Sequence, residues 1–228
     1  MAAFPFDAVL FDCDGVLVDS ELITNRVLAE MLGELGWPVT PAESMRIFLG
    51  KAVRDEAALI EARTGKPFSE EWLLAFRRRR NLALEQELEA IPGAPLAVRE
   101  LHARLEGRMA VASGADLYKV RMQLAKVGIL DCFEGRVFSG QDLPRSKPHP
   151  DVYLAAASAL GVDPRRCAVI EDTVTGASAG VAAGATVFGY SPRQPGHDSG
   201  AALRGAGVAH VFSDMAELPS LLAGWATS

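Results

Sequence analysis

The sequence of 228 residues has few cysteines, no long hydrophobic run and no excess of positive charge. Cys13, Cys132 and Cys167 are far apart and odd in number, which excludes a disulfide framework and suits a reducing compartment. The longest apolar runs fall well short of the roughly 20 residues of a transmembrane helix, and residues 1–7 show no secretory signal. We therefore expect a cytoplasmic protein that has no membrane partner.

The sequence contains 23 lysines and arginines and 29 aspartates and glutamates, so its net charge is −6. This balance disfavours attraction to nucleic acid. The basic run from Arg77 to Arg80 does not form one basic face, because successive helical residues point about 100° apart. We expect a small-molecule partner, no nucleic acid, and a monomer or small homo-oligomer.

Hydrophobic residues make up 49% of the chain and charged residues 23%, as in an ordinary globular protein. Several short apolar runs end in turn residues, which is typical of strands buried on both faces of a parallel sheet. The predicted strands are 8–11, 109–112, 136–138, 168–170, 186–188 and 210–212, and the helix patterns among them are 95–105, 117–127, 151–160 and 176–183. This alternation predicts an α/β fold with a doubly wound parallel sheet.

The segment 18–89 breaks the alternation, because it contains helix patterns and no convincing strand. Asp19 and Ser20 are the candidate caps for its first helix. Thr40 precedes a proline and an acid in the order typical of a helix start. The sequence therefore predicts a catalytic α/β core of residues 1–17 and 90–228. An all-helical subdomain of residues 18–89 is inserted after the first strand.

Polar residues follow the predicted strands at their carboxyl ends, where open α/β sheets bind ligands. They are Asp12 and Asp14, Ser113 and Gly114, Lys147 in the loop before a helix, and Glu171 and Asp172. Several carboxylates come together only when they are protonated or matched by cations. An oxygen-rich set without histidine or cysteine suits a hard cation, and Mg²⁺ is the first choice. Lys147, the Ser113 hydroxyl and the Gly114 amide suit a phosphate group beside it.

Four motifs in order carry a resemblance to a known family. The first is Asp12-x-Asp14-Gly15-Val16-Leu17-Val18-Asp19-Ser20, the second and third are Ser113 and Lys147, and the fourth is Glu171-Asp172-Thr173-x-x-Gly176. They resemble the motifs of the haloacid dehalogenase-like hydrolases, in the phosphatase and beta-phosphoglucomutase-like branch. The resemblance covers nearly the whole chain, since the helical insert falls where that branch has a cap subdomain after the first strand. It implies a Rossmann-like core with a helical cap.

The resemblance also implies roles for these residues. Asp12 is expected to be the nucleophile that forms an aspartyl-phosphate, and Asp14 the general acid and base. The implied Mg²⁺ ligands are the Asp12 carboxylate, the Asp14 main-chain carbonyl and Asp172, with Glu171 either a ligand or a neighbour of the ligands. Lys147, Ser113 and Gly114 are expected to bind the phosphoryl group. Taken singly, each residue also has a structural explanation, such as a turn acid before Gly15.

Departures from the family narrow the expected reaction. Dehalogenases of this fold lack an acid at the position of Asp14, and the phosphonate-cleaving branch has a cap lysine where residues 20–35 contain none. The mutase branch has a histidine on the first cap helix where this chain has Thr24.

Substrate contacts from the cap are expected at Lys51, Arg54 and Arg80. His102, His149, His197 and His210 have no paired spacing, so we expect them at the surface or behind the site residues.

We therefore predict a Mg²⁺-dependent phosphatase that hydrolyses a small phosphorylated metabolite of the sugar phosphate or phosphoglycolate type. A beta-phosphoglucomutase-like mutase is the alternative enzyme, and the residue at position 24 argues against it. A phosphoaspartate signalling receiver uses a similar set of side chains. Its phosphorylated aspartate, however, does not end the first strand, and it has no place for a helical insert.

Overall fold

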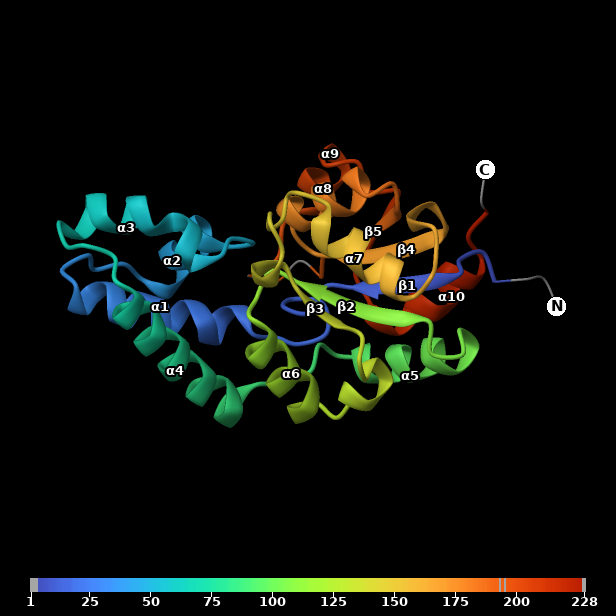
Figure 1. Ribbon diagram of the computed structural model, residues 1–228, viewed down its shortest axis with the longest axis horizontal. Coiled ribbons are helices and arrows are strands. Elements are labelled where there is room, and N and C mark those ends of the chain that lie inside the picture. Colours follow the sequence, from blue (N-terminus) through green and yellow to red (C-terminus); the bar gives the residue numbers. More distant parts are fainter. Residues whose placement is uncertain (1–3, 193, 195, 227–228) are drawn as a thin grey trace.

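A six-stranded parallel sheet forms the centre of the larger part of the molecule (Figure 1). The computed structural model describes residues 4–192, 194 and 196–226. The strands are β1 (Ala8–Phe11), β2 (Met109–Ser113), β3 (Val137–Ser139), β4 (Cys167–Glu171), β5 (Thr186–Tyr190) and β6 (His210–Phe212). Their order in the sheet is β3-β2-β1-β4-β5-β6, so the chain winds outward in opposite directions from β1 and β4. The predicted doubly wound parallel sheet is confirmed. The strands 8–11 and 210–212 lie where they were predicted, and the ends of the others differ from the prediction by at most two residues.

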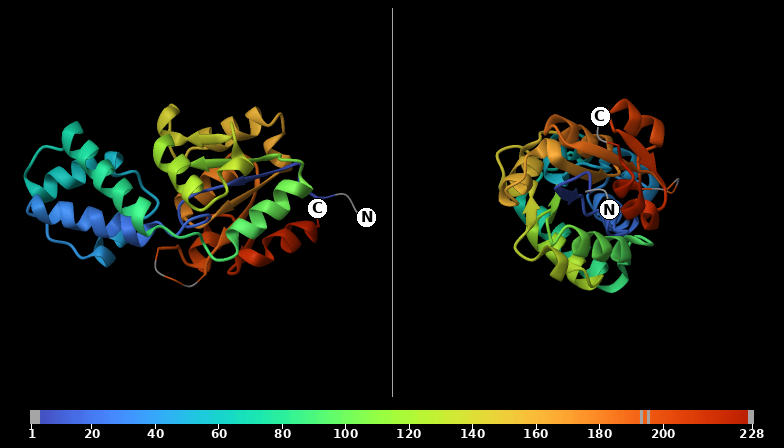
Figure 2. Two further views of the ribbon diagram at one scale, coloured as in Figure 1. Left: turned by 90° about the horizontal axis from the view of Figure 1, so that it is seen from below. Right: turned by 90° about the vertical axis from the view of Figure 1, so that its right-hand side faces the viewer.

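Both faces of the sheet are covered by helices, which explains why the strands are unbroken apolar runs. The covering helices are α5 (Ala94–Arg104), α6 (Leu117–Lys126), α7 (Asp151–Ala159), α8 (Val174–Ala182), α9 (Gly200–Gly205) and α10 (Leu218–Ala223). Val9 and Phe11 of β1 pack in the core on the side of α5, α6 and α10. Ala8 and Leu10 pack on the opposite side with α7, α8 and α9. Figure 2 shows these helices around the sheet.

A second, all-helical part stands beyond one end of the sheet (Figure 1). It contains α1 (Glu21–Glu34), α2 (Pro41–Phe48), α3 (Ala57–Thr64) and α4 (Glu70–Glu87). These helices pack around their own buried cluster, which includes Leu32, Phe48 and Phe76. Thr40 begins α2 with a reciprocal capping box. Ser20 occupies the cap position of α1, but its side chain does not cap the helix and bonds to Asp14 instead.

The two connections between these parts run side by side (Figure 2). Val18 pairs with Ala90 in an antiparallel bridge, and the Asp19 amide donates to the Glu89 carbonyl at 3.0 Å. The Ile91 amide donates to the carbonyl of residue 17 at 3.1 Å. A short two-stranded ribbon, formed by the last part of the first motif and residues 89–91, therefore links the helical part to the sheet.

None of the helices in the described ranges combines the length and the apolar character that crossing a membrane requires.

Candidate active site

The carboxyl ends of β1 and β4 lie next to each other, at the point where the strand order reverses. Asp12 follows β1 directly, and Asp172 follows β4. Ligands of open α/β sheets bind at such a point, because neighbouring loops diverge there. Ser113 ends the adjacent strand β2, and Lys147 reaches the same edge from the loop before α7. The structure therefore brings together the four segments that the sequence singled out.

Lys147 joins the first and fourth motifs. Its ammonium group donates to Oδ1 of Asp12 at 2.7 Å and to Oε1 of Glu171 at 2.6 Å. The Tyr153 hydroxyl donates to the same Glu171 oxygen at 2.6 Å. Burial alone would lower the pKa of Lys147, but the Asp12 and Glu171 carboxylates raise it above its ordinary value. Lys147 is therefore a fixed positive charge beside Asp12.

Asp12, Glu171 and Asp172 form a buried acidic cluster, with one oxygen from each lying within 4.8 Å of the others. Burial raises the pKa of Asp12 to about 7, where Glu171 and Asp14 add to the effect of burial and Lys147 opposes it. Burial, Glu171 and Asp12 also raise the pKa of Asp172 well above its ordinary value. One ammonium group thus balances three carboxylates, which leaves the cluster short of positive charge.

Asp172 shows where a cation fits. Both of its carboxylate oxygens are buried and lack a hydrogen-bond partner among the described residues. A carboxylate buried in this way is stable only with a proton or a cation beside it. Gly15 packs so closely that a Cβ atom there would lie 2.1 Å from Oδ2 of Asp172. The all-oxygen donors of the cluster fit a hard divalent cation such as Mg²⁺.

Glu171 is the most fully hydrogen-bonded acid of the cluster. Its Oε1 accepts from Lys147 and Tyr153, and its Oε2 accepts from the amide of Asp172 at 3.2 Å. Gly176 packs directly against it, because a Cβ atom there would lie 1.8 Å from Oε1. This contact gives a physical reason for glycine at the end of the fourth motif. Glu171 orients the residues around it.

Asp14 has hydrogen-bond partners that differ from those of this cluster. Its Oδ1 accepts from the Lys119 ammonium at 2.7 Å, from the Gln123 amide at 2.9 Å and from the Ser20 hydroxyl at 2.5 Å. Burial would raise the pKa of Asp14, but the Lys119 charge and these three hydrogen bonds lower it to about 2. Asp14 is therefore ionised at neutral pH in this arrangement.

Ser113 and Gly114 form part of the pocket wall. The Ser113 oxygen accepts from the amide of Ala115 at 3.0 Å, which leaves its hydroxyl hydrogen to donate. Apart from its chain neighbours, no atom of the described residues lies within 4 Å of the position a Cβ atom would take at Gly114, so the main chain is open to a ligand there. Both groups suit contacts with phosphate oxygens.

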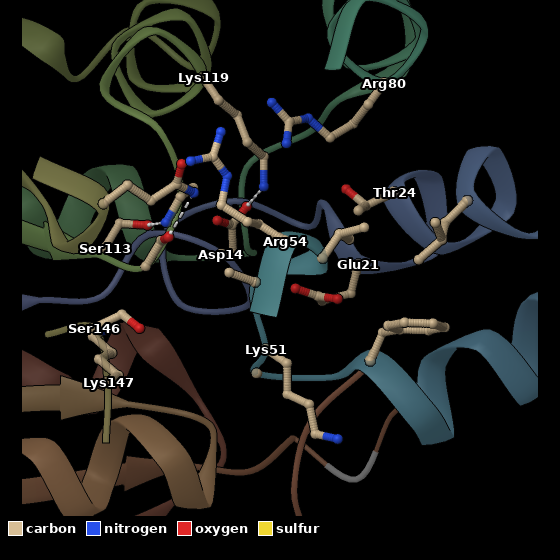
Figure 3. Close-up of a pocket in the computed structure, with 18 of the residues that line it drawn as sticks. Asp14, Glu21, Thr24, Lys51, Arg54, Arg80, Ser113, Lys119, Ser146 and Lys147 are labelled. Atoms are coloured by element: carbon tan, nitrogen blue, oxygen red, sulfur yellow. Dashed lines mark hydrogen bonds and ion pairs between the residues drawn. The ribbon is translucent and has the colours of Figure 1, made fainter. Parts of the chain in front are cut away.

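The three candidate cap residues also reach the pocket (Figure 3). Arg80 is buried and donates to Oδ2 of Asp116 at 2.8 Å, which ties α4 to α6 of the sheet domain. Lys51 pairs with Glu56 at 3.1 Å, and Arg54 pairs with a glutamate at the start of α4. The side chains of Lys51 and Arg54 are about half exposed, at 44% and 54%. Of these three side chains, that of Arg80 is therefore held most firmly in one position.

Several residues of the site escaped the sequence analysis. Lys119 and Gln123 lie four residues apart on α6 and are both buried, among apolar neighbours such as Val120. A polar pair at this spacing on an apolar helix face was the available signal. Glu21 of α1 lines the pocket as well. Thr24 lines it too, although the sequence pointed to Thr24 only as the position of the mutase histidine.

His197 lies close to the acidic cluster. Its side chain is buried, with Nε2 2.8 Å from the carbonyl oxygen of Gly15 and 4.0 Å from Oδ2 of Asp172. The histidines were expected either at the surface or behind the site residues, and His197 lies behind them.

The topology and the site define a doubly wound α/β enzyme with a buried acidic cluster and a lysine at its switch point. The profile of the haloacid dehalogenase-like hydrolases matches residues 6–184. The 6-phosphogluconate phosphatase of Escherichia coli K12 is 33% identical over 183 residues, which cover 80% of this chain and 81% of that protein. Hexitol phosphatase B of the same organism is 32% identical over 181 residues, covering 77% and 79%.

Among solved structures, a haloacid dehalogenase family hydrolase of Deinococcus radiodurans R1 with bound phosphate and sodium has a TM-score of 0.75 and 38% identity. The match covers 96% of each chain. The protein described here belongs to the haloacid dehalogenase-like hydrolase family. The predicted family is confirmed, and so is the predicted enzyme class, a phosphoric monoester hydrolase.

Proposed function

We propose that the protein is a Mg²⁺-dependent phosphatase that hydrolyses a small sugar-derived phosphate through an aspartyl-phosphate on Asp12. The observation that carries this proposal is the contact of Lys147 with both Asp12 and Glu171, beside the unpartnered carboxylate of Asp172. This arrangement offers a nucleophile, a fixed positive charge and a cation site at one point. The similarity to phosphatases named for 6-phosphogluconate and for hexitols supports a sugar-derived substrate.

The residues divide the reaction between them. The Asp12 carboxylate attacks phosphorus and forms a new P–O bond, while the leaving oxygen departs and takes a proton from Asp14. Asp14 then accepts a proton from a water molecule that attacks the same phosphorus, which releases phosphate and frees Asp12. Lys147, Ser113 and the Gly114 amide bind the oxygens of the transferring group.

The cation site has a defined place in this scheme. The Asp12 and Asp172 carboxylates and the Asp14 main-chain carbonyl would hold Mg²⁺, with Glu171 orienting them. When bound, the ion offsets the negative charges of Asp12 and the substrate phosphate, so that two anionic groups come together. Glu171 is assigned to the surrounding shell because hydrogen bonds from neighbouring groups already engage both of its oxygens.

Residues 18–89 are proposed to act as a cap that closes over this site. They are joined to the sheet domain by the paired connections around Val18 and Ala90. A cap excludes water while the leaving group departs and admits one water molecule afterwards. Lys51, Arg54 and Arg80 then contribute to substrate selection. We place the enzyme in the cytoplasm, where phosphorylated metabolites are found and its three free cysteines stay reduced.

A screen for phosphate release tests this proposal. Purified protein with Mg²⁺ is incubated with 6-phosphogluconate, hexitol phosphates, hexose phosphates, phosphoglycolate and 4-nitrophenyl phosphate, and inorganic phosphate is measured. The Asp12→Asn variant, purified in the same way, controls for contaminating phosphatases. We expect turnover of sugar-derived phosphates by the wild type and none by the variant. Absence of phosphate release from every compound, or equal release by the variant, would contradict the proposal.

A further inference from the structure

The first turn of α1 presents a polar face to the pocket. Glu21, Thr24 and Asn25 all line it, at positions i, i+3 and i+4 of the helix. Figure 3 shows the Glu21 carboxylate and the Thr24 hydroxyl on the side of α1 that faces Asp14. Because α1 begins a few residues after Asp14, this face lies beside the acid that meets the leaving group. It is therefore placed to contact the part of the substrate that departs.

The Glu21 carboxylate is held in place from behind. The amide nitrogen of Asn25 donates to Oε2 of Glu21 at 3.1 Å and to the Glu21 carbonyl at 3.0 Å. The amide oxygen of Asn25 accepts from the hydroxyl of Ser44 on α2 at 2.8 Å. Asn25 and Ser44 are both buried. A surface helix acid has no need of such an arrangement, whereas a binding group depends on supporting hydrogen bonds for its orientation.

Thr24 gives a second and independent observation. Its hydroxyl oxygen is buried and has no hydrogen-bond partner among the described residues. Native proteins rarely leave such a group unsatisfied, so its position at the pocket wall indicates a partner supplied by a ligand. Thr24 and Glu21 lie one helical turn apart, so a single ligand can reach both.

The chemistry of the two groups defines what that ligand offers. An ionised carboxylate only accepts hydrogen bonds, and a hydroxyl both donates and accepts. Burial raises the pKa of Glu21 to about 7, with Asp14 and Asp12 adding to this effect and Lys119 opposing it. Further hydrogen-bond donors from a ligand would therefore stabilise its ionised form. A second anionic group at this place would be repelled. Neutral hydroxyl groups match both residues.

We infer that Glu21 and Thr24 bind hydroxyl groups on the leaving-group carbons, and that the enzyme selects phosphates of polyhydroxylated alcohols over those of plain alcohols. This inference rests on the proposed phosphatase activity and defines its substrate class further. Sites that hydrogen-bond a substrate hydroxyl discriminate strongly against the analogue without it, because their own polar groups are then left unpaired.

A matched pair of substrates tests the inference. Erythritol 4-phosphate and n-butyl phosphate have four carbons each and differ in their hydroxyl groups. We expect the wild type to show a higher kcat/KM for erythritol 4-phosphate, and Glu21→Gln to lower the ratio of the two values about tenfold or more, chiefly through KM. Thr24→Val, which keeps the side-chain shape, lowers the ratio in the same direction. Glu30→Gln on the exposed face of α1 is the control and keeps the wild-type ratio.

The other outcomes separate the two proposals. No phosphate release from these two compounds and from every compound of the screen above would contradict the phosphatase proposal itself. No release from these two compounds by a preparation that is active in the screen would overturn the hydroxyl inference. Release from both compounds without preference for the polyol would overturn the hydroxyl inference alone. Equal losses on both substrates in both variants, or a raised Mg²⁺ requirement in Glu21→Gln, would also overturn it, by placing Glu21 with the catalytic groups. Thermal unfolding checks that each variant folds. If Glu21→Gln does not fold, Thr24→Val alone tests the inference.

Discussion

The ammonium group of Lys119 lies 2.7 Å from Oδ1 of Asp14, with both side chains largely withdrawn from solvent. This contact joins α6 to the turn after β1, and Ser20 at the start of α1 binds the same oxygen. Burial would raise the pKa of Asp14, but these partners lower it to about 2, so the group has no proton to give at neutral pH. Asp14 must therefore leave Lys119 before it serves as the acid for a leaving group.

Replacing Lys119 by methionine tests this relationship. Without the neighbouring charge the pKa of Asp14 rises, so its protonated form persists to higher pH. The alkaline limb of the kcat/KM profile should move upward by about 1–3 pH units, the usual effect of losing an adjacent opposite charge. Lys126→Met, on the same helix but hydrogen-bonded to the main chain of Glu85, is the control. Superimposable profiles for wild type and Lys119→Met would show that Lys119 does not govern Asp14.

Binding of Mg²⁺ should depend on pH through Asp12. In the metal-free fold the pKa of Asp12 is raised from 3.8 to about 7, with burial as the first cause. The folded carboxyl therefore keeps its proton while an unfolded aspartate loses it, so this group stabilises the metal-free fold below pH 4 and ceases to as the pH rises towards 7. A cation must displace that proton at low pH.

The measurement is the increase in melting temperature caused by Mg²⁺. We expect a larger increase at pH 8 than at pH 5.5, and a much smaller one at both in Asp172→Ala. EDTA should abolish phosphate release, and Ca²⁺ should restore it poorly because of its looser coordination. An increase in melting temperature that is the same at both pH values would contradict the role of Asp12 as a ligand.

Arg80 should contribute to both stability and substrate affinity. Its guanidinium donates to Asp116 at 2.8 Å, and the side chain is only 8% exposed. Arg80→Met leaves the partly buried Asp116 short of a partner, so the free energy of unfolding should fall by about 1–3 kcal/mol, and KM should rise as α4 loosens from α6. Arg79→Met, on the same helix but 51% exposed, should cost about 0–1 kcal/mol. Urea unfolding and KM measurements that give matching values for both variants would contradict this role.

The residue at position 24 separates a phosphatase from a mutase. Thr24 has no group that titrates near neutral pH, whereas the mutase branch has a histidine at the aligned position. Water should therefore attack the phosphorylated Asp12 faster than a sugar intermediate can reorient in the site. When the enzyme is incubated with a hexose 1-phosphate and a bisphosphate primer, we expect inorganic phosphate or no reaction. The reaction is monitored by ³¹P NMR. Formation of hexose 6-phosphate faster than phosphate release would favour the mutase.

The sheet, and the motif residues at its carboxyl edge, were predictable from local sequence. Runs such as Ala8 to Phe11 were recognised as buried strands because both of their faces meet helices. The runs of β1, β2 and β4 are closed by polar residues of the site. Carboxyl ends of parallel strands meet at one edge, so Asp12 and Asp172 had to converge once the sheet was inferred. Lys147 followed from its place in the motif order.

The partners of Asp14 were not predictable, because they depend on packing between distant segments. Lys119 and Gln123 bond to Asp14 across separations of 105 and 109 residues, and no local pattern states which loop the buried face of α6 meets. Ser20 was expected to cap α1, but its hydroxyl donates to Asp14 because the first motif folds back against the start of that helix. Glu21 was not singled out, because acids are common in the first turn of a helix.

A burst experiment tests the nucleophilic role of Asp12 most directly. 4-Nitrophenyl phosphate has a good leaving group that needs little help from an acid, so Asp14→Asn should form the aspartyl-phosphate and then hydrolyse it slowly. Rapid mixing of this variant with substrate and Mg²⁺ should release about one nitrophenolate per active site before a slow phase. The double variant Asp12→Asn/Asp14→Asn should show no burst. A burst of equal size in the double variant would contradict the assignment of Asp12 as the nucleophile.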